Sequence, residues 1–230
     1  MQTTPTKKPG CELPTVERLL DTAERLFGEH GFDGVGMRAL AQEAGVNLGA
    51  ATYHFGSKEQ LYTATFLRRF RAMDAERQRQ LQSARVAAKG RPIPVIKIVD
   101  CMLRPLFMIG LEHPCFHTLA LRNLFFPPPF IHSALHKELE SNHEIFLQEL
   151  CRSLKPLPQD VIRLREMFCK GTLLAFSMHM NKLQMAQDPV LIETILKELV
   201  QFVTLGLQGH PVTGSAGYRL PPDLLKPPQP

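Results

Sequence analysis

Two short helical segments joined by three residues constrain the fold of this chain more than any other feature of its sequence. Residues 37–44 read MRALAQEA and residues 48–55 read LGAATYHF, with Gly45, Val46 and Asn47 between them. Gly45 can end the first helix and Asn47 can cap the second. In a helix-turn-helix, this spacing places the first helix across the DNA backbone and the second in the major groove. Ordinary helical hairpins share the spacing, so it indicates DNA binding without establishing it.

Helical patterns continue over the rest of the chain. Apolar residues recur every three or four positions from Thr15, which can cap a helix, to the stop at Gly31. Ser57 and Gln60 form an S-x-x-Q capping box, in which each side chain bonds the other's backbone N–H, and a long helix follows to Ala88. Prolines separate the later helices, and alternating strand patterns are absent. We therefore predict an all-α fold.

Composition divides the chain into four predicted parts. Residues 1–14 form a flexible basic arm, and residues 15–62 form an N-terminal three-helix helix-turn-helix domain. Residues 63–208 form a larger helical domain for ligand binding and dimerisation. Residues 209–230 contain six prolines and three glycines and form a Pro-rich tail.

The overall composition favours a soluble, cytoplasmic protein. No apolar stretch approaches the roughly 20 residues of a membrane-spanning helix. The N-terminus lacks the pattern of a signal peptide, and the five cysteines are scattered as reduced thiols usually are. Within the net charge of +5, residues 61–91 hold eight Lys and Arg against two Asp and Glu. We interpret this basic surplus as a solvated helix face.

No pattern in the sequence indicates an enzyme. The GxSxG, Walker and GxGxxG motifs are absent. Ser177 and His179 are neighbours, but residues two apart on a helix face different ways, so the imidazole cannot reach the hydroxyl as a base. We predict no catalytic residue, no cofactor and no bound metal.

The second short helix has an unusually bare first turn. Gly49, Ala50 and Ala51 carry almost no side chain, although glycine inside a helix costs about 1 kcal/mol relative to alanine. A recognition helix must approach base edges closely, and this requirement would justify the glycine. The surface of this helix therefore favours DNA binding over an ordinary hairpin.

The stretch LLDTAERLFGEHGFDGVGMRALAQEAGVNLGAATYHFGSKEQLY resembles the N-terminal domain of the tetracycline-repressor (TetR) family of transcriptional regulators. The resemblance spans about 45 consecutive residues. It rests on three blocks of residues: Ala23, Leu26, Phe27, Gly31 and Phe32; Leu40, Ala41, Ala44, Gly45 and Val46; and Tyr53, His54, Phe55, Ser57, Lys58 and Leu61.

The resemblance implies a homodimeric regulator, typically a repressor, that binds a pseudo-palindromic double-stranded DNA operator. Tyr53, His54 and Lys58 match positions that hold phosphates. Gly36 departs from the family, in which Ser or Thr usually caps the second helix and contacts a phosphate. The predicted DNA-binding residues are Arg38, Asn47, Leu48, Gly49, Ala50, Thr52, Tyr53, His54 and Lys58.

The same resemblance implies release from DNA by a small-molecule effector, for which the sequence favours a hydrophobic compound. The predicted pocket residues are Met102, Phe107, Met108, Leu121 and Phe125, any of which could instead be close-packed core. The predicted dimerisation residues, on the last two long helices, are Phe176, Leu191, Ile195, Leu199 and Phe202. Arg104 and Arg122 could pair with an effector's carboxylate or with Glu112.

Two other functions remain open from the sequence. The first is a metal-sensing regulator of the same fold, because histidine and cysteine ligands recur at short spacing. Its candidate ligands are His113, Cys115 and His117, or His132 and His136. The second is a helical interaction protein without DNA binding.

Overall fold

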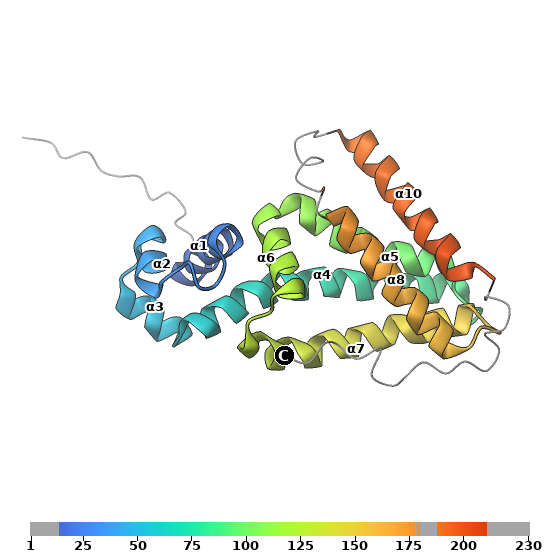
Figure 1. Cartoon of the computed structure of the whole chain (residues 1–230), viewed down its shortest axis with the longest axis horizontal. Coiled ribbons are helices and arrows are strands. Elements are labelled where there is room, and N and C mark those ends of the chain that lie inside the picture. The colour runs from blue at the N-terminus through green and yellow to red at the C-terminus, as the bar shows by residue number, and fades with distance from the viewer. Residues whose placement is uncertain (1–13, 178, 180–187, 211–230) are drawn as a thin grey trace, which may run out of the picture.

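The computed structural model describes residues 14–177, 179 and 188–210, apart from the side chains at 124–125, 132–143, 170, 173–174 and 177. The described chain is all-α, as predicted, and contains no strand. Figure 1 shows α1, α2 and α3 at one end and the longer helices extending from them. The helices are α1 (Thr15–His30), α2 (Met37–Glu43), α3 (Leu48–Phe55), α4 (Lys58–Ala88), α5 (Val95–Glu112), α6 (Pro114–Phe125), α7 (Pro129–Ser153), α8 (Gln159–Ser177) and α10 (Pro189–Gln208).

Local signals determine the turn between α2 and α3, as the sequence predicts. Gly45 has a φ of 64°, a left-handed conformation that glycine adopts at little cost. The Asn47 side chain then caps α3, because its Oδ1 accepts a hydrogen bond from Ala50 N at 2.7 Å. The helix-turn-helix spacing is therefore present in the folded chain.

The predicted cap at Thr15 and the predicted capping box at Ser57 differ from the structure. Thr15 lies inside the first turn of α1, because Pro14 occupies the capping position and accepts Arg18 N through its carbonyl. Ser57 does cap α4, with its Oγ accepting Gln60 N at 3.3 Å. The return bond of a capping box is not made, because Ser57 N donates to the Phe55 carbonyl at 2.8 Å instead.

Helix α4 runs through the predicted domain boundary at residue 62 and joins two hydrophobic clusters. The proximal cluster includes Phe27 of α1, the inward side chains of α4 from Leu61 to Met73, and Phe116 of α6. The distal cluster begins on α4 at Leu81 and includes inward side chains of α5, α7 and α10. Because α4 contributes to both cores, it connects the α1–α3 end to the larger domain.

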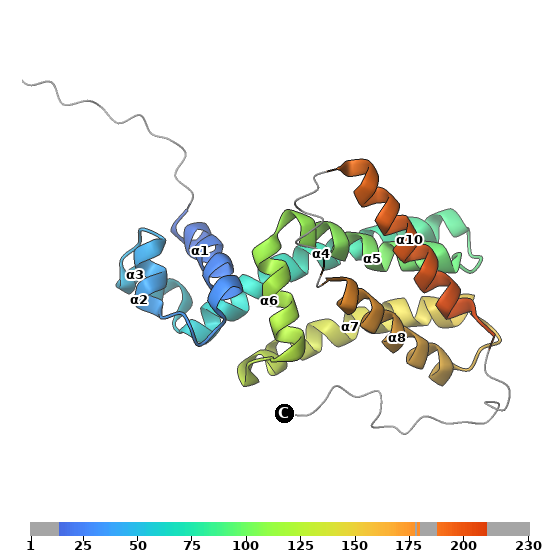
Figure 2. The same ribbon diagram turned by 45° about the horizontal axis from the view of Figure 1, so that its top comes forward.

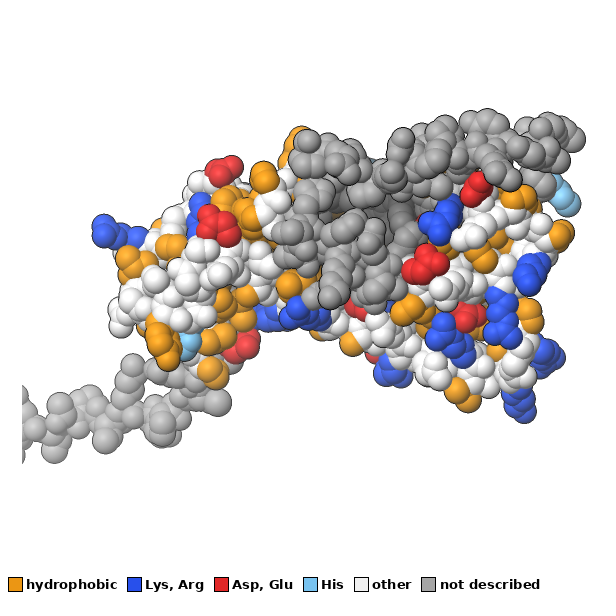
Figure 3. All heavy atoms as spheres, turned by 90° about the horizontal axis from the view of Figure 1, so that it is seen from below, with side chains coloured by type: hydrophobic (Ala, Val, Ile, Leu, Met, Phe, Trp, Pro, Cys, Tyr) orange, Lys and Arg blue, Asp and Glu red, His pale blue; other side chains and the backbone are white. Residues whose placement is uncertain are grey.

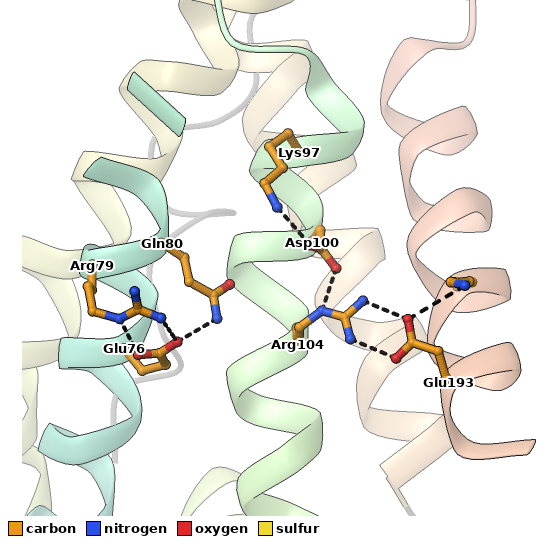
Figure 4. Close-up of polar contacts among 8 residues, drawn as sticks. Glu76, Arg79, Gln80, Lys97, Asp100, Arg104 and Glu193 are labelled. Carbon is orange, nitrogen blue, oxygen red and sulfur yellow. Dashed lines mark hydrogen bonds and ion pairs between the residues drawn. The ribbon is translucent and has the colours of Figure 1, made fainter. Parts of the chain in front are cut away.

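Helices α5, α8 and α10 lie together in the larger domain (Figure 2), with α10 packed on both α5 and α8. An ion-pair network crosses from α5 to α10 (Figure 4). Arg104 Nη1 and Nη2 lie 2.8 and 3.1 Å from the Glu193 carboxylate, and Arg104 Nε lies 2.9 Å from Asp100 Oδ1. None of the described helices combines the length and apolar composition that a membrane span requires.

Candidate nucleic-acid interface

Helix α3 is held against α1 and α2 by a small apolar cluster. Leu19, Ala41 and Ala44 form this cluster with Ala51, which has no exposed surface. The placement of Ala51 on the bare outer surface was therefore wrong, because contact with Leu19 and Ala41 turns this residue inward. The orientation of the recognition helix is set by these small residues.

The opposite face of α3 is open to solvent. Leu48, Gly49 and Thr52 are exposed, Ala50 is partly buried, and Tyr53 is 85% exposed. A Cβ added to Gly49 would meet only the Asn47 side chain, at 3.3 Å. A side chain here would press on the Asn47 cap of α3, whereas glycine leaves the surface bare and available to an external partner.

The predicted phosphate contacts surround this face. Tyr53 and His54 are both exposed, and their rings make an edge contact with centroids 5.3 Å apart. Arg38 projects from the first turn of α2 and is also exposed. Phenol, imidazole and guanidinium groups can each donate to phosphate oxygens.

Lys58 has a partner within the chain that the sequence did not indicate. Its Nζ donates to the Phe32 carbonyl at 3.1 Å and lies 4.0 Å above the centre of the Phe32 ring. The ammonium thereby ties the turn after α1 to the first residue of α4. Because an ammonium carries three N–H donors, this contact leaves donors for a phosphate.

The charge distribution is uneven along the molecule. On the face shown in Figure 3, Lys and Arg side chains gather at the end away from α1–α3, and fewer lie on the α1–α3 end. Residues 1–60 hold six Lys and Arg against eight Asp and Glu. Glu59 lies beside Lys58, and its hydrogen bond with Ser57 lowers the pKa of the Glu59 carboxyl. Attraction of phosphate groups to this end would therefore depend on a few individual Lys and Arg side chains rather than on a broad basic surface.

An ion-pair network that was not predicted from the sequence joins α1 to α4. Glu24 is buried and lies 2.8 Å from both Arg68 Nη2 and Arg69 Nε. Arg68 Nη1 also reaches Glu17 and Asp21, at 3.0 and 2.8 Å. The interpretation of the arginine-rich stretch as a solvated face is therefore wrong for these two arginines, because an acidic stripe on α1 draws them inward.

Helix α6 holds α1 and α4 through polar contacts as well. Arg122 donates from Nε and Nη2 to the carbonyls of Gly28 and Glu29, at 3.3 and 3.2 Å, rather than to Glu112. The Tyr62 hydroxyl donates to Asn123 Oδ1 at 2.6 Å in the protein interior. Burial raises the pKa of Tyr62 to about 12, so the hydroxyl stays a donor at neutral pH.

The predicted pocket residues in the described part of the chain differ in their burial. Phe107 is buried and stacks on Phe176, with ring centroids 5.8 Å apart, whereas Met108 is exposed. Met102 packs partly buried against the distal cluster, Leu121 is partly buried, and the Phe125 side chain lies outside the described residues. An open cavity of about 430 Å³ lies elsewhere, lined by residues 153–158 and 208–210.

The predicted dimerisation residues divide into outward and inward sets. Phe202 and Leu191 are 65% and 41% exposed on α10, and Ile195 is partly buried. Leu199 lies in the distal cluster of its own chain and Phe176 packs on Phe107, so neither lies on an exposed face as predicted. Further apolar side chains that are exposed on these two helices are Met167, Phe168, Val190 and Leu205.

His113, Cys115 and His117 are the metal-site candidates whose side chains the structure describes. In the described part of the chain, no group of three or more His, Cys, Asp or Glu side chains could hold a metal ion. His113 lies at the junction of α5 and α6, Cys115 lies against Gly28 of α1, and His117 is buried, which lowers its pKa. The side chains of His132 and His136 lie outside the described residues.

Comparison with known proteins identifies the N-terminal region. A family model described as bacterial regulatory proteins, tetR family, matches residues 19–73. The transcriptional regulator UidR of Escherichia coli (strain K12) is 32% identical over 108 residues, covering 47% of this chain and 48% of UidR. The transcriptional repressor AcnR of Corynebacterium efficiens is 42% identical over 48 residues, covering 21% of this chain and 26% of AcnR. The chain thus spans about half the length of UidR and about a quarter of the length of AcnR.

Solved structures extend the likeness to the whole fold. The structure of PfmR, a TetR family transcriptional regulator from Thermus thermophilus, superposes with a TM-score of 0.59 at 18% identity. The superposition covers 87% of this chain and 99% of PfmR. At this identity the likeness concerns the fold alone.

The predicted arm falls almost wholly in residues 1–13, and most of the predicted tail falls in residues 211–230, both outside the described residues.

Proposed function

The chain belongs to the TetR family of bacterial regulatory proteins, and from this premise we propose that it is a homodimeric transcriptional repressor of the cytoplasm. It binds a pseudo-palindromic DNA operator through α3 and leaves it when a small effector binds. The observation that best supports this proposal is the outer face of α3. That face is exposed, nearly free of side chains at Gly49 and Ala50, and flanked by donors at Arg38, Tyr53 and Lys58.

Few side chains of this interface can contact the DNA bases. Asn47 uses its Oδ1 for capping, which leaves its amide N–H₂ for a base acceptor. The Thr52 hydroxyl can donate or accept, and Leu48 can pack on a thymine methyl group. The donors around them fix the position of α3 on the sugar-phosphate backbone.

Dimerisation supplies the second reading helix. The exposed apolar residues of α8 and α10, among them Phe168 and Phe202, form a surface that a second copy of the chain would cover. The two α3 helices would then reach successive major grooves, about 34 Å apart or a multiple of that distance. AcnR is named a repressor, which supports the same sign of regulation here.

Release by an effector requires that the larger domain move the reading helices. The contacts of α1 with α4 and α6, through Glu24 and Arg122, make the α1–α3 end follow those two helices. To change the ratio of the DNA-binding state to the released state from 99:1 to 1:99, the free energy of effector binding must favour the released state by about 5.5 kcal/mol.

Replacing Gly49 by leucine tests the proposal. A Cβ at this position lies 3.3 Å from Asn47 Oδ1, which caps α3, so the thermal midpoint of G49L is measured beside its DNA binding to show that the variant is folded. The leucine side chain should block entry into the groove and abolish retention of operator DNA selected from the source genome. The control is A87L, which adds a leucine side chain at an exposed position of α4, outside α3 and outside the apolar surface of α8 and α10. DNA binding by G49L at wild-type affinity would contradict the proposal.

A further inference from the structure

One arginine of α1 lies beside the turn of the helix-turn-helix and has no acidic partner among the described residues. Arg18 Nη1 would lie 3.9 Å from a Cβ added to Gly45, the exposed residue at which the turn between α2 and α3 begins. Leu19, the next residue of α1, belongs to the small apolar cluster with Ala44 and Ala51. The guanidinium of Arg18 is therefore held next to the start of the recognition helix.

The N–H donors of the Arg18 side chain are unused within the described part of the chain. Its Nε is buried and makes no hydrogen bond there, and its two terminal nitrogens make none either. Of these three nitrogens only Nε is buried, so both terminal nitrogens are open to solvent. Because Arg18 is half-buried, part of its hydration is lost, and an anion that accepts from the terminal nitrogens would compensate for that loss.

The carboxylates closest in sequence to Arg18 and to the turn are paired with other arginines. Glu17, the residue before Arg18, lies 3.0 Å from Arg68 of α4. Glu43, at the end of α2, lies 2.6 Å from Arg25 of α1. Neither of these two carboxylates compensates the positive charge of Arg18.

The helix-turn-helix itself supplies no cation at the start of α3. The predicted phosphate contacts lie at the start of α2, at the end of α3 and at the start of α4: Arg38, Tyr53, His54 and Lys58. Residues 43–52, which include the turn and the first turn of α3, contain no Lys, Arg or His. Arg18 of α1 is therefore the side chain that brings positive charge to this part of the interface.

We propose that Arg18 binds a phosphate of the DNA backbone and thereby fixes the start of α3 in the major groove. A guanidinium can bind a phosphate through two parallel N–H groups, which suits the two accessible terminal nitrogens of Arg18. The inference rests on the proposed function, to which it adds a contact from a helix outside the helix-turn-helix. Since a phosphate contact reads no base, Arg18 would raise the affinity for the operator and for unrelated duplexes alike.

The test measures affinity and its dependence on salt. Fluorescence anisotropy of the full chain is recorded at several salt concentrations, with the duplex retained from the source genome and with a scrambled duplex of the same composition. R18M keeps an apolar stem but removes the charge, and it should weaken binding to both duplexes by roughly 10- to 100-fold. A dimer loses two phosphate contacts, each worth about 0.9 in the slope of log affinity against log salt concentration, so the slope should become shallower by about 1.8.

Two further variants distinguish a phosphate contact from a structural role. R91M removes the same charge from an exposed arginine just beyond the end of α4 that lies opposite α3, and it should bind DNA as the wild type does. R18K keeps the charge and should retain most of the salt slope. If Arg18 only supported the turn, R18M would lose preference for the operator over the scrambled duplex and keep the wild-type slope. That result, or wild-type affinity in R18M, would overturn the inference; R18Q takes its place if thermal unfolding shows that R18M is not folded.

The wild-type measurements separate this inference from the proposed function. If the wild type retains genomic DNA and R18M binds it with the same affinity and slope, the repressor proposal stands and the Arg18 contact is wrong. If the wild type retains no DNA, the repressor proposal fails and the contact fails with it. If the wild type binds and R18M alone loses affinity and slope, both proposals are supported.

Discussion

The buried hydrogen bond between Tyr62 and Asn123 allows a quantitative test of how α4 and α6 are joined. The Tyr62 hydroxyl donates to Asn123 Oδ1 at 2.6 Å, and Asn123 Nδ2 is buried with no hydrogen-bond partner among the described residues. Changing Tyr62 to phenylalanine keeps the ring in the proximal cluster and removes only the donor. Both polar atoms of the Asn123 amide are then buried and unsatisfied.

The cost of this change follows from the loss of the partner. Leaving a buried polar group unsatisfied costs about 1–3 kcal/mol. For a domain of this size, each kcal/mol lowers the midpoint of thermal unfolding by about 2–4 °C. With a central value of about 2 kcal/mol, Y62F should therefore unfold roughly 4–8 °C below the wild type.

Thermal unfolding followed by far-ultraviolet circular dichroism measures the shift, at one protein concentration because a dimer's midpoint depends on it. Y53F is the matched control, since Tyr53 is 85% exposed and its loss should leave the midpoint unchanged. Replacing Asn123 by leucine in the Y62F background removes the orphaned amide and should recover most of the lost stability. A midpoint for Y62F equal to that of Y53F would refute the reasoning.

Three further predictions concern the DNA end, the dimer and the effect of pH. G36S should cap α2 and tighten operator binding, because Gly36 has an extended backbone and no atom lies near a new side chain. Fluorescence anisotropy measures the affinity, and weaker binding would count against a phosphate contact at this position. F202E should shift light-scattering mass from dimer to monomer, and V86E, an equally exposed apolar site on α4, should not. Burial lowers the pKa of His117, so the unfolded chain takes up the proton before the folded chain as pH falls below about 6.5, and stability decreases. H117Q should reduce this decrease in the unfolding midpoint between about pH 7.5 and 5.5. H30Q, a change at an exposed histidine, should leave the decrease as it is in the wild type.

The parts of the structure that the sequence predicts depend on local chemistry. The turn at Gly45 needs a left-handed residue, and Asn47 bonds a backbone N–H three residues ahead, so both signals are complete within a few positions. The start of α4 at Ser57 is fixed in the same way. The end of α2 and the starts of α3 and α4 follow from these signals.

The parts that the sequence did not predict depend on partners far along the chain. Glu24 meets Arg68 and Arg69 across 44 and 45 residues. A signal was available, because Glu17, Asp21 and Glu24 recur at helical spacing on α1 and indicate an acidic stripe. Only the folded chain shows that the stripe faces α4.

The predicted pocket residues differ in burial, which composition does not reveal. The prediction followed composition and selected Phe107 and Met108 together, although neighbours on a helix point about 100° apart. In the structure Phe107 is buried and Met108 is exposed.

The continuity of α4 through residue 62 limits how the DNA-binding end can be exchanged between proteins. A fragment ending at that residue would lose Phe66 and Phe70 of α4 and Phe116 of α6, which complete the core around Phe27. It would also lose both arginines that neutralise Glu24. A chimaera that transplants this specificity must therefore carry the first half of α4 together with a compatible α6, or alter only the outer face of α3.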